Sequence, residues 1–260
     1  MTPRRHRGGL LVLGVLPLHL GQAHAQTAAD TYYDPAAMAA ARAALKENHG
    51  NQSNALLIAE RLEYQNTDKE NALVWEAQGW LGTDLHKLWV KSEGEYENEG
   101  RLEEAELQFL YSRAVSPFWD LQAGIRYDIE PSPERTHLVL GAQGLAPYWF
   151  EMDGALFLSD EGNVSARLEA EYEMFLTQRL ILQPRLELNL ATSDDEELRI
   201  GRGFFDSVVE LRLRYEFRRE FAPYLGISWG GDFNRTADLV EQSGQDPQEF
   251  SIVAGVRVWF

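Results

Sequence analysis

The chain has 260 residues with 24 Lys and Arg, 41 Asp and Glu, a formal net charge of −17 and no cysteine. A chain this acidic is not expected to bind the phosphates of nucleic acids, and the lack of cysteine excludes disulfides and thiolate metal sites. The acidity suits a surface or lumen that meets cations, although solvated acidic loops would account for it equally well.

The first 25 residues have the features of a secretory signal peptide. Three arginines precede an apolar run over residues 10–20, and Ala23 and Ala25 place small residues at the two positions that determine cleavage. The run is shorter than the roughly 20 residues that a membrane-spanning helix needs, and no later stretch approaches that length. We therefore predict an exported protein that starts at Gln26 and has no transmembrane helix after cleavage.

Residues 26–54 differ in kind from the rest and are predicted to form a periplasmic leader. Asp34, Pro35, an alanine-rich stretch to Lys46 and then Gly50 predict a short helix with an acidic cap and a glycine stop. The leader is either a periplasmic extension, a plug for a lumen, or a poorly ordered segment before the first strand.

Residues 55–260 predict an all-β fold, a single antiparallel β-barrel of the outer-membrane type. Units of about 10 to 12 residues alternate apolar and polar side chains and end in turns, as membrane strands do, and lipid outside with a polar interior can accommodate both faces. Twelve such strands are predicted, at residues 55–65, 72–82, 86–96, 102–113, 117–128, 136–145, 147–158, 163–174, 178–190, 206–217, 221–233 and 249–260.

The last strand alternates to its final residue, Phe260, which is aromatic. Such a strand is typical of the end of a barrel in the outer membrane of a Gram-negative bacterium, so Phe260 is the expected signal to the barrel-assembly machinery, which inserts the chain into outer-membrane lipid. Counting back from this strand makes the long connections at 129–135, 191–205 and 234–248 external. An aromatic girdle is expected near the periplasmic strand ends, from Trp80, Trp89, Trp119, Trp149 and Trp259, of which the last two are candidates to point inward.

Alternation places charges of both signs on the inner face of three neighbouring strands. The residues concerned are Arg167, Glu169, Glu171 and Glu173, then Arg185 and Glu187, then Glu210, Arg212, Arg214 and Glu216. Because these charges face each other across about 5 Å and an unpaired one would be costly, we predict a ladder of ion pairs. The ladder either fills and stiffens a narrow lumen or forms a polar path for a small solute or ion.

The sequence does not favour an enzyme. Three histidines lie beyond the predicted signal peptide, His49, His86 and His137, and none belongs to a spaced catalytic motif. The enzyme alternative is a twelve-stranded outer-membrane phospholipase, which needs a serine and a histidine on the lipid-facing side near the outer rim. His137 and Ser159 are its candidates.

Five stretches resemble the copper-resistance protein B family of bacterial outer membranes. They are residues 111–120 (YSRAVSPFWD), 144–151 (GLAPYWFE), 166–172 (ARLEAEY), 176–185 (LTQRLILQPR) and 219–226 (REFAPYLG). The likeness covers about residues 55–260. It implies an outer-membrane protein of copper homeostasis that binds copper or helps to move it out of the periplasm, with periplasmic copper-handling proteins as candidate partners. A small-solute channel without metal specificity is the alternative.

One departure from that family concerns copper ligands. Many of its members carry a segment rich in Met and His before the barrel, but here residues 26–54 contain only Met38 and His49, which are the candidate metal ligands. Alternation places Met152 and Met174 among lipid-facing side chains. The copper chemistry of this chain is therefore expected to be weak, relocated to lumen carboxylates, or lost.

Overall fold

The computed structural model describes residues 29–49, 52–67, 71–97 and 100–260, so the predicted signal peptide, residues 1–25, lies outside the described residues. The chain divides after Asn51 into two compact units. The first contains the predicted helix, α1 (Pro35–His49), which is capped where the Ala37 amide donates a hydrogen bond of 3.0 Å to Asp34 Oδ2. No helix among the described residues is both long enough and apolar enough to cross a membrane.

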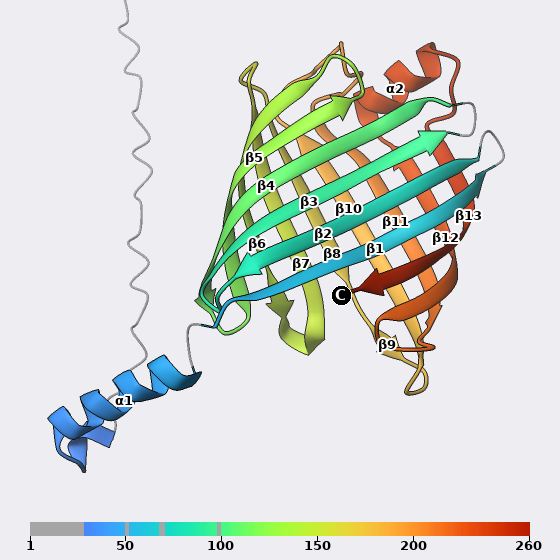
Figure 1. The fold of residues 1–260 in the computed structure, drawn as a ribbon. Coiled ribbons are helices and arrows are strands. Elements are labelled where there is room, and N and C mark those ends of the chain that lie inside the picture. Colours follow the sequence, from blue (N-terminus) through green and yellow to red (C-terminus); the bar gives the residue numbers. More distant parts are fainter. Residues whose placement is uncertain (1–28, 50–51, 68–70, 98–99) are drawn as a thin grey trace, which may run out of the picture. The chain divides into compact units, whose positions relative to one another are not determined.

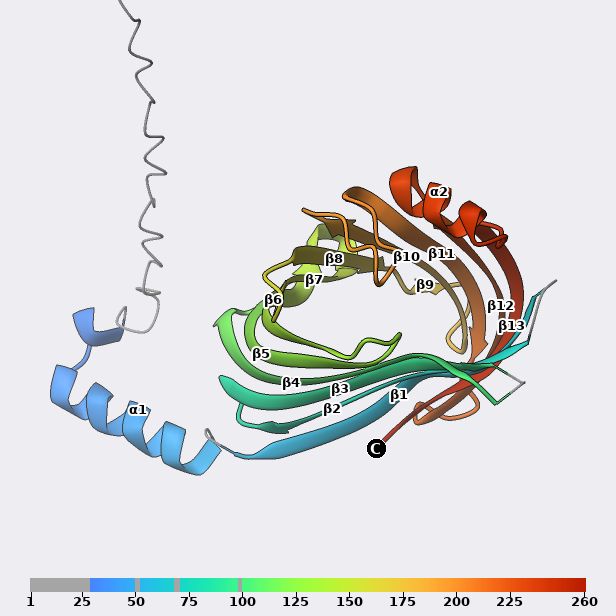
Figure 2. The same ribbon diagram turned by 90° about the horizontal axis from the view of Figure 1, so that it is seen from above.

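The second unit is an antiparallel barrel (Figures 1 and 2). Its strands are β1 (Asn54–Thr67), β2 (Ala72–Gly82), β3 (His86–Glu97), β4 (Leu102–Ser116), β5 (Trp119–Glu130), β6 (Arg135–Ala146), β7 (Phe150–Ser159), β8 (Val164–Glu171), β9 (Met174–Phe175), β10 (Leu180–Ala191), β11 (Gly203–Tyr215), β12 (Phe221–Asp232) and β13 (Gln248–Trp259). β8 and β9 both pair with β10 as two segments of one strand, so the described strands occupy twelve positions in the ring. Pairing of β1 with β13 and of β10 with β11 closes the ring. The predicted twelve-stranded barrel is confirmed.

Three local features differ from the predicted strands. Residues 147–149 form a short turn, η2 (Pro147–Trp149), and do not begin a strand, because Tyr148 and Trp149 have left-handed φ values of 67° and 68°. The strand predicted at 163–174 is interrupted between β8 and β9. The connection between β12 and β13 contains an unpredicted helix, α2 (Asn234–Gln242).

The two ends of the barrel have different connections. Short turns at residues 83–85, 117–118 and 216–220 lie at one end, which we call the turn end, and the connections at 192–202 and 233–247 lie at the other, the loop end. Short turns face the periplasm in outer-membrane barrels. Figure 1 shows α2 at the loop end.

The barrel is inverted relative to a soluble protein, with apolar residues exposed and charged residues buried. On β11, Val209 and Leu211 are 46% and 39% exposed, whereas Glu210, Arg212 and Arg214 are at most 3% exposed. This arrangement is stable where the outer face meets lipid and the charges inside find partners.

Two of the predicted girdle tryptophans instead face the interior. Trp80 and Trp89 are paired across β2 and β3, with ring centroids 6.3 Å apart. Trp89 lies two residues before Lys91, which lines the lumen, and therefore shares its face. It packs on an interior apolar cluster of Leu110, Val139 and Phe157. The girdle prediction was wrong for this pair because it considered how close the two residues lie to the strand ends and not which face alternation assigns to them.

Candidate functional site

A row of carboxylates crosses one inner wall of the barrel. Four of them occupy directly paired positions on the neighbouring strands β2, β3, β4 and β5: Glu76, Glu93, Glu106 and Asp128. Like charges in directly opposite positions of a sheet repel each other and destabilise it. The row therefore needs cations placed between its members.

Three arginines supply those cations, each between two successive carboxylates. Arg61 lies 2.6 Å from Glu76 and 2.9 Å from Glu93. Arg167 lies 3.2 Å from Glu93 and 3.1 Å from Glu106. Arg126 lies 2.8 Å from Glu106 and 2.5 Å from Asp128. The result is an alternation of charge in which every carboxylate of the row has a guanidinium partner.

The opposite wall carries the charges that alternation placed inward on β8, β10 and β11. Arg185 pairs with Glu210 at 3.0 Å, Glu169 at 2.8 Å and Glu187 at 3.0 Å. Arg212 pairs with Glu210 at 2.7 Å. Neighbouring strands are thus joined by ion pairs. Arg185 and Arg212 share the carboxylate of Glu210, a residue that is 2% exposed.

The remaining members of the predicted ladder lie nearer the turn end. Arg214 contacts Glu173 and donates a hydrogen bond of 2.8 Å to the side-chain oxygen of Gln183. Glu216 is 3.9 Å from Arg214. Glu171 accepts a hydrogen bond from the Gln183 amide, although it is paired with Arg185 in the sheet register.

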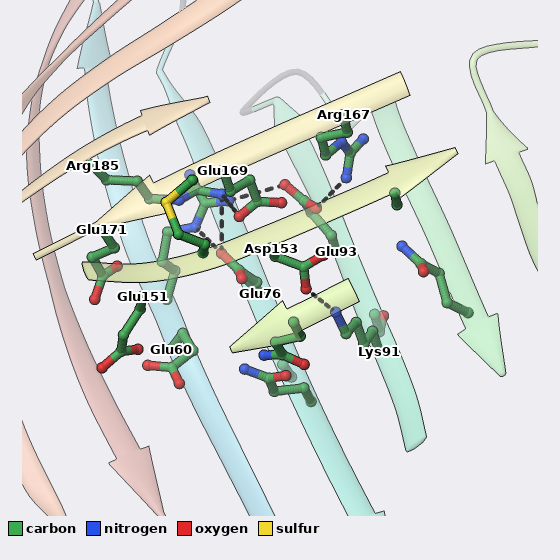
Figure 3. Close-up of a pocket in the computed structure, with 18 of the residues that line it drawn as sticks. Glu60, Glu76, Lys91, Glu93, Glu151, Asp153, Arg167, Glu169, Glu171 and Arg185 are labelled. Atoms are coloured by element: carbon green, nitrogen blue, oxygen red, sulfur yellow. Dashed lines mark hydrogen bonds and ion pairs between the residues drawn. The ribbon is translucent and has the colours of Figure 1, made fainter. Parts of the chain in front are cut away.

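Several ion pairs also join strands that are not neighbours. Arg61 on β1 reaches Glu210 on β11 at 3.4 Å, although β12 and β13 lie between those strands. Arg212 reaches Glu63 on β1 at 3.2 Å. Arg167 on β8 reaches the carboxylate row on β3 and β4, as Figure 3 shows for Glu93. We call these joined residues the lumen network: Arg61, Arg126, Arg167, Arg185, Arg212, Glu63, Glu76, Glu93, Glu106, Asp128, Glu169, Glu187 and Glu210.

Sequence reasoning missed the β1 to β5 half of this network. Alternation along β2, β3 and β4 places their carboxylates inward, but the inward position of Arg61 depends on an irregularity in β1. The β1–β2 register passes from Ala59↔Ala77 to Arg61↔Glu76, which leaves Glu60 as the extra residue of a β-bulge. Both Glu60 and Arg61 consequently line the lumen, which strict alternation does not allow.

A cavity of about 390 Å³ lies in the lumen. The lumen network bounds it on one side, and towards the turn end it is lined by acidic residues of β1, β7 and β8 that we call the chamber residues: Glu60, Glu151, Asp153 and Glu171 (Figure 3). Arg257 lies 2.5 Å from Glu60, and Lys91 lies 2.6 Å from Asp153. Among the described residues, no ion pair joins Glu151 or Glu171 to a basic side chain, so two of the four chamber residues have no cationic partner.

Comparison with known proteins identifies the family. Residues 53–260 match the family model described as "Copper resistance protein B precursor (CopB)". A copper resistance protein B of Escherichia coli is 44% identical over 212 residues, which are 82% of this chain and 71% of that protein. A copper resistance protein B homolog of Pseudomonas syringae pv. tomato is 40% identical over 212 residues, 82% of this chain and 72% of that protein. This chain belongs to the copper resistance protein B family.

Among solved structures, a NanC porin is similar in fold, with a TM-score of 0.53, 13% sequence identity, and coverage of 78% of this chain and 98% of that chain. The likeness concerns the fold alone. Together with the inverted distribution of apolar and charged residues, it places this copper resistance protein B family member in the bacterial outer membrane.

The candidate copper ligands of this family member are dispersed. Met38 is half-buried in α1, and His49 is the last residue of that helix. Met174 is 43% exposed, as expected for a lipid-facing residue, and Met152 lies between Glu151 and Asp153, which line the lumen, so its side chain is on the opposite face of β7. Among the described residues, no group of three or more His, Cys, Asp and Glu has the arrangement of a metal site.

The residues of the phospholipase alternative lie on the inner face. His137 and Ser159 are directly paired across β6 and β7, and they share the faces of Val139 and Phe157, which line the lumen. The phospholipase alternative requires both side chains to face lipid. In the described part of the chain, no hydrogen bond joins the two side chains, and Ser159 Oγ accepts one of 3.0 Å from the Asn163 amide. Their inward placement does not fit the phospholipase alternative.

Proposed function

We propose that this barrel serves copper resistance by attracting copper cations into the chamber and assisting their removal from the periplasm, without catalysis. Membership of the copper resistance protein B family over the whole barrel carries the proposal. Periplasmic copper-handling proteins are the proposed partners at the turn end.

The chamber gives this proposal a physical basis. Its carboxylates without an ion-pair partner favour cations, and their oxygens are acceptable ligands for Cu(II). Since the chamber residues do not form a compact ligand set, copper should bind weakly and exchange quickly. Weak binding suits a protein that passes copper on, because a tightly held ion would not leave.

A small-solute channel without metal specificity is the second candidate, and the porin-like fold favours it. The two candidates differ in whether the chamber carboxylates matter for copper. A channel without metal specificity would pass neutral and charged solutes of similar size, and removal of the chamber charges would leave copper handling unchanged.

The test uses a bacterial strain that lacks its own copy of the gene and is complemented with variants of this chain. Glu151→Gln combined with Glu171→Gln removes two chamber carboxylates at almost constant volume. Asp238→Asn combined with Glu241→Gln removes two exposed carboxylates from α2 and serves as the matched control.

The measurements are the copper content of the periplasm and growth at raised copper concentration. We expect more periplasmic copper and poorer growth with the chamber variant, and wild-type values with the control. Equal behaviour of the two variants would argue against the chamber, and unchanged copper content on loss of the whole protein would favour the channel without metal specificity.

A further inference from the structure

Arg167 is one side chain that connects opposite walls of the barrel. On its own side, Arg167 Nε lies 3.4 Å from Glu187 on the neighbouring strand β10. Its terminal nitrogens lie 3.2 Å from Glu93 on β3 and 3.1 Å from Glu106 on β4. In the closed ring, β8 and β3 are separated by the four strands β4 to β7 on one side and by six on the other, so the contact crosses the lumen near its full width.

The crossing occurs where the cavity ends. The cavity is lined by network residues, including Arg61, Arg167 and Arg185, and by the chamber residues towards the turn end. Carboxylates farther along the same inward faces towards the loop end, such as Glu95 on β3 and Glu104 on β4, are not among the described residues that line it. The lumen network therefore separates the chamber from the loop-end half of the lumen.

The lumen network also contains more carboxylates than arginines. Among the described residues it contains eight carboxylates and five arginines, an excess of three negative charges if all are ionised. A narrow passage with surplus carboxylates attracts cations and repels anions. If the passage opens, cations are the ions that it should admit.

We propose that the lumen is a cation-selective pathway held shut by those ion pairs of the lumen network that join opposite walls, among them the pairs of Arg167 with Glu93 and Glu106. The inference goes beyond a role in copper resistance, because it concerns any small cation and does not depend on copper binding. The guanidinium of Arg167 fills the position between Glu93 and Glu106 that a passing cation would take.

Arg126 provides a closely matched control. Like Arg167 it pairs with Glu106, at 2.8 Å, and its guanidinium also lies over the ring of Phe157, at 4.8 Å against 5.9 Å for Arg167. Arg126 lies on β5, next to β4, so its ion pairs stay on one wall. The two arginines share a carboxylate partner and an aromatic neighbour, and they differ in that Arg167 crosses the lumen.

The experiment measures the conductance of the purified barrel in planar lipid bilayers in potassium chloride, with no copper present. Arg167→Gln removes the crossing charge, while Glu93 and Glu106 keep Arg61 and Arg126 as partners. We expect the wild type and Arg126→Gln to conduct little. Arg167→Gln should conduct several-fold more, with a reversal potential in a salt gradient that shows preference for potassium over chloride.

Circular dichroism and heat-dependent mobility in gels establish that each variant is folded. If Arg167→Gln does not fold, Arg167→Met combined with Glu93→Gln removes both charges of one crossing contact and leaves no lone charge, and the same rise in conductance is expected. Each of four results would overturn the proposal: a folded Arg167 variant that stays closed, an equal rise in conductance for Arg126→Gln, a preference for chloride over potassium, or a wild type that is already open. None of these results depends on whether the protein binds copper.

Discussion

At the scale of single residues, the inner wall depends on buried charges that have partners. Arg212 is 3% exposed and pairs with Glu210 and Glu63, whose side chains are 1% and 0% exposed. Arg235 on α2 pairs with Glu196 at the loop end, but these side chains are 49% and 78% exposed. The same kind of ion pair should therefore have very different importance at the two places, since removal of a buried partner leaves an uncompensated charge away from water.

Arg212→Ala should lower the free energy of unfolding by about 3 kcal/mol, because Glu210 and Glu63 stay buried after the loss of their partner. Arg235→Ala should lower it by less than about 1 kcal/mol. Urea titration of the barrel in lipid vesicles gives both values, and the leakage of small solutes from those vesicles should rise only for Arg212→Ala. Unchanged unfolding and leakage for Arg212→Ala would mean that Arg212 does not hold the lumen closed.

Alternation along the sequence was enough to place Arg212, Arg214 and Glu210 on the inner face, because the side chains of a strand alternate strictly. It could not place Arg61, since the bulge at Glu60 shifts the alternation by one residue. The partners of Arg167 across the lumen were also out of reach, because contacts between strands that are not neighbours depend on the width and curvature of the closed barrel.

At the scale of elements, the ring is closed by the pairing of β13 with β1. Phe260 follows β13, and its amide donates a hydrogen bond of 2.8 Å to Leu57 O while the Leu57 amide donates one of 3.1 Å to Phe260 O. Phe260 is 79% exposed, so its side chain is available to a partner during assembly. The last residue thus continues the closing ladder beyond Trp259.

Deletion of Phe260 should reduce assembly in the outer membrane and leave export intact, because the closing pair of hydrogen bonds and the exposed aromatic ring are lost together. The amount of heat-modifiable, folded barrel in outer-membrane fractions measures assembly, and the amount of processed chain in the periplasm measures export. Phe260→Tyr, which keeps the backbone and an aromatic ring, is the control and should assemble normally. Normal levels of folded barrel after deletion would contradict this role.

The strands themselves were largely predictable, as β2 illustrates with predicted and observed bounds of 72–82. The departures occur where a backbone feature interrupts alternation without leaving a pattern in the sequence. Tyr148 and Trp149 adopt positive φ, which is unusual for aromatic residues, and α2 is too short for its helical period to stand out in a polar connection.

At the scale of the whole molecule, the leader and the barrel differ in the side chains that could bind copper. In residues 26–54 the only imidazole and thioether side chains are His49 and Met38. They lie eleven positions apart in α1, which at 1.5 Å per residue separates their backbones by about 16 Å along the helix axis. They therefore cannot jointly coordinate one ion while the helix is intact.

Removal of residues 26–54 should consequently lower the number of bound copper ions by one at most. Elemental analysis of the purified protein with and without this segment, at equal free copper, gives the stoichiometry. Met38→Leu combined with His49→Gln in the full chain should have the same effect as the truncation. Loss of several tightly bound ions with the segment would show that ligands other than these two hold copper there.

Calorimetric titration of the purified barrel, residues 52–260, with copper is the most direct test of the central claim that copper enters the lumen and meets the chamber. We predict weak binding of few ions that is reduced several-fold by Glu151→Gln combined with Glu171→Gln and unchanged by Asp238→Asn combined with Glu241→Gln. Absence of binding to the barrel, or binding that the chamber variant leaves unchanged, would contradict the account.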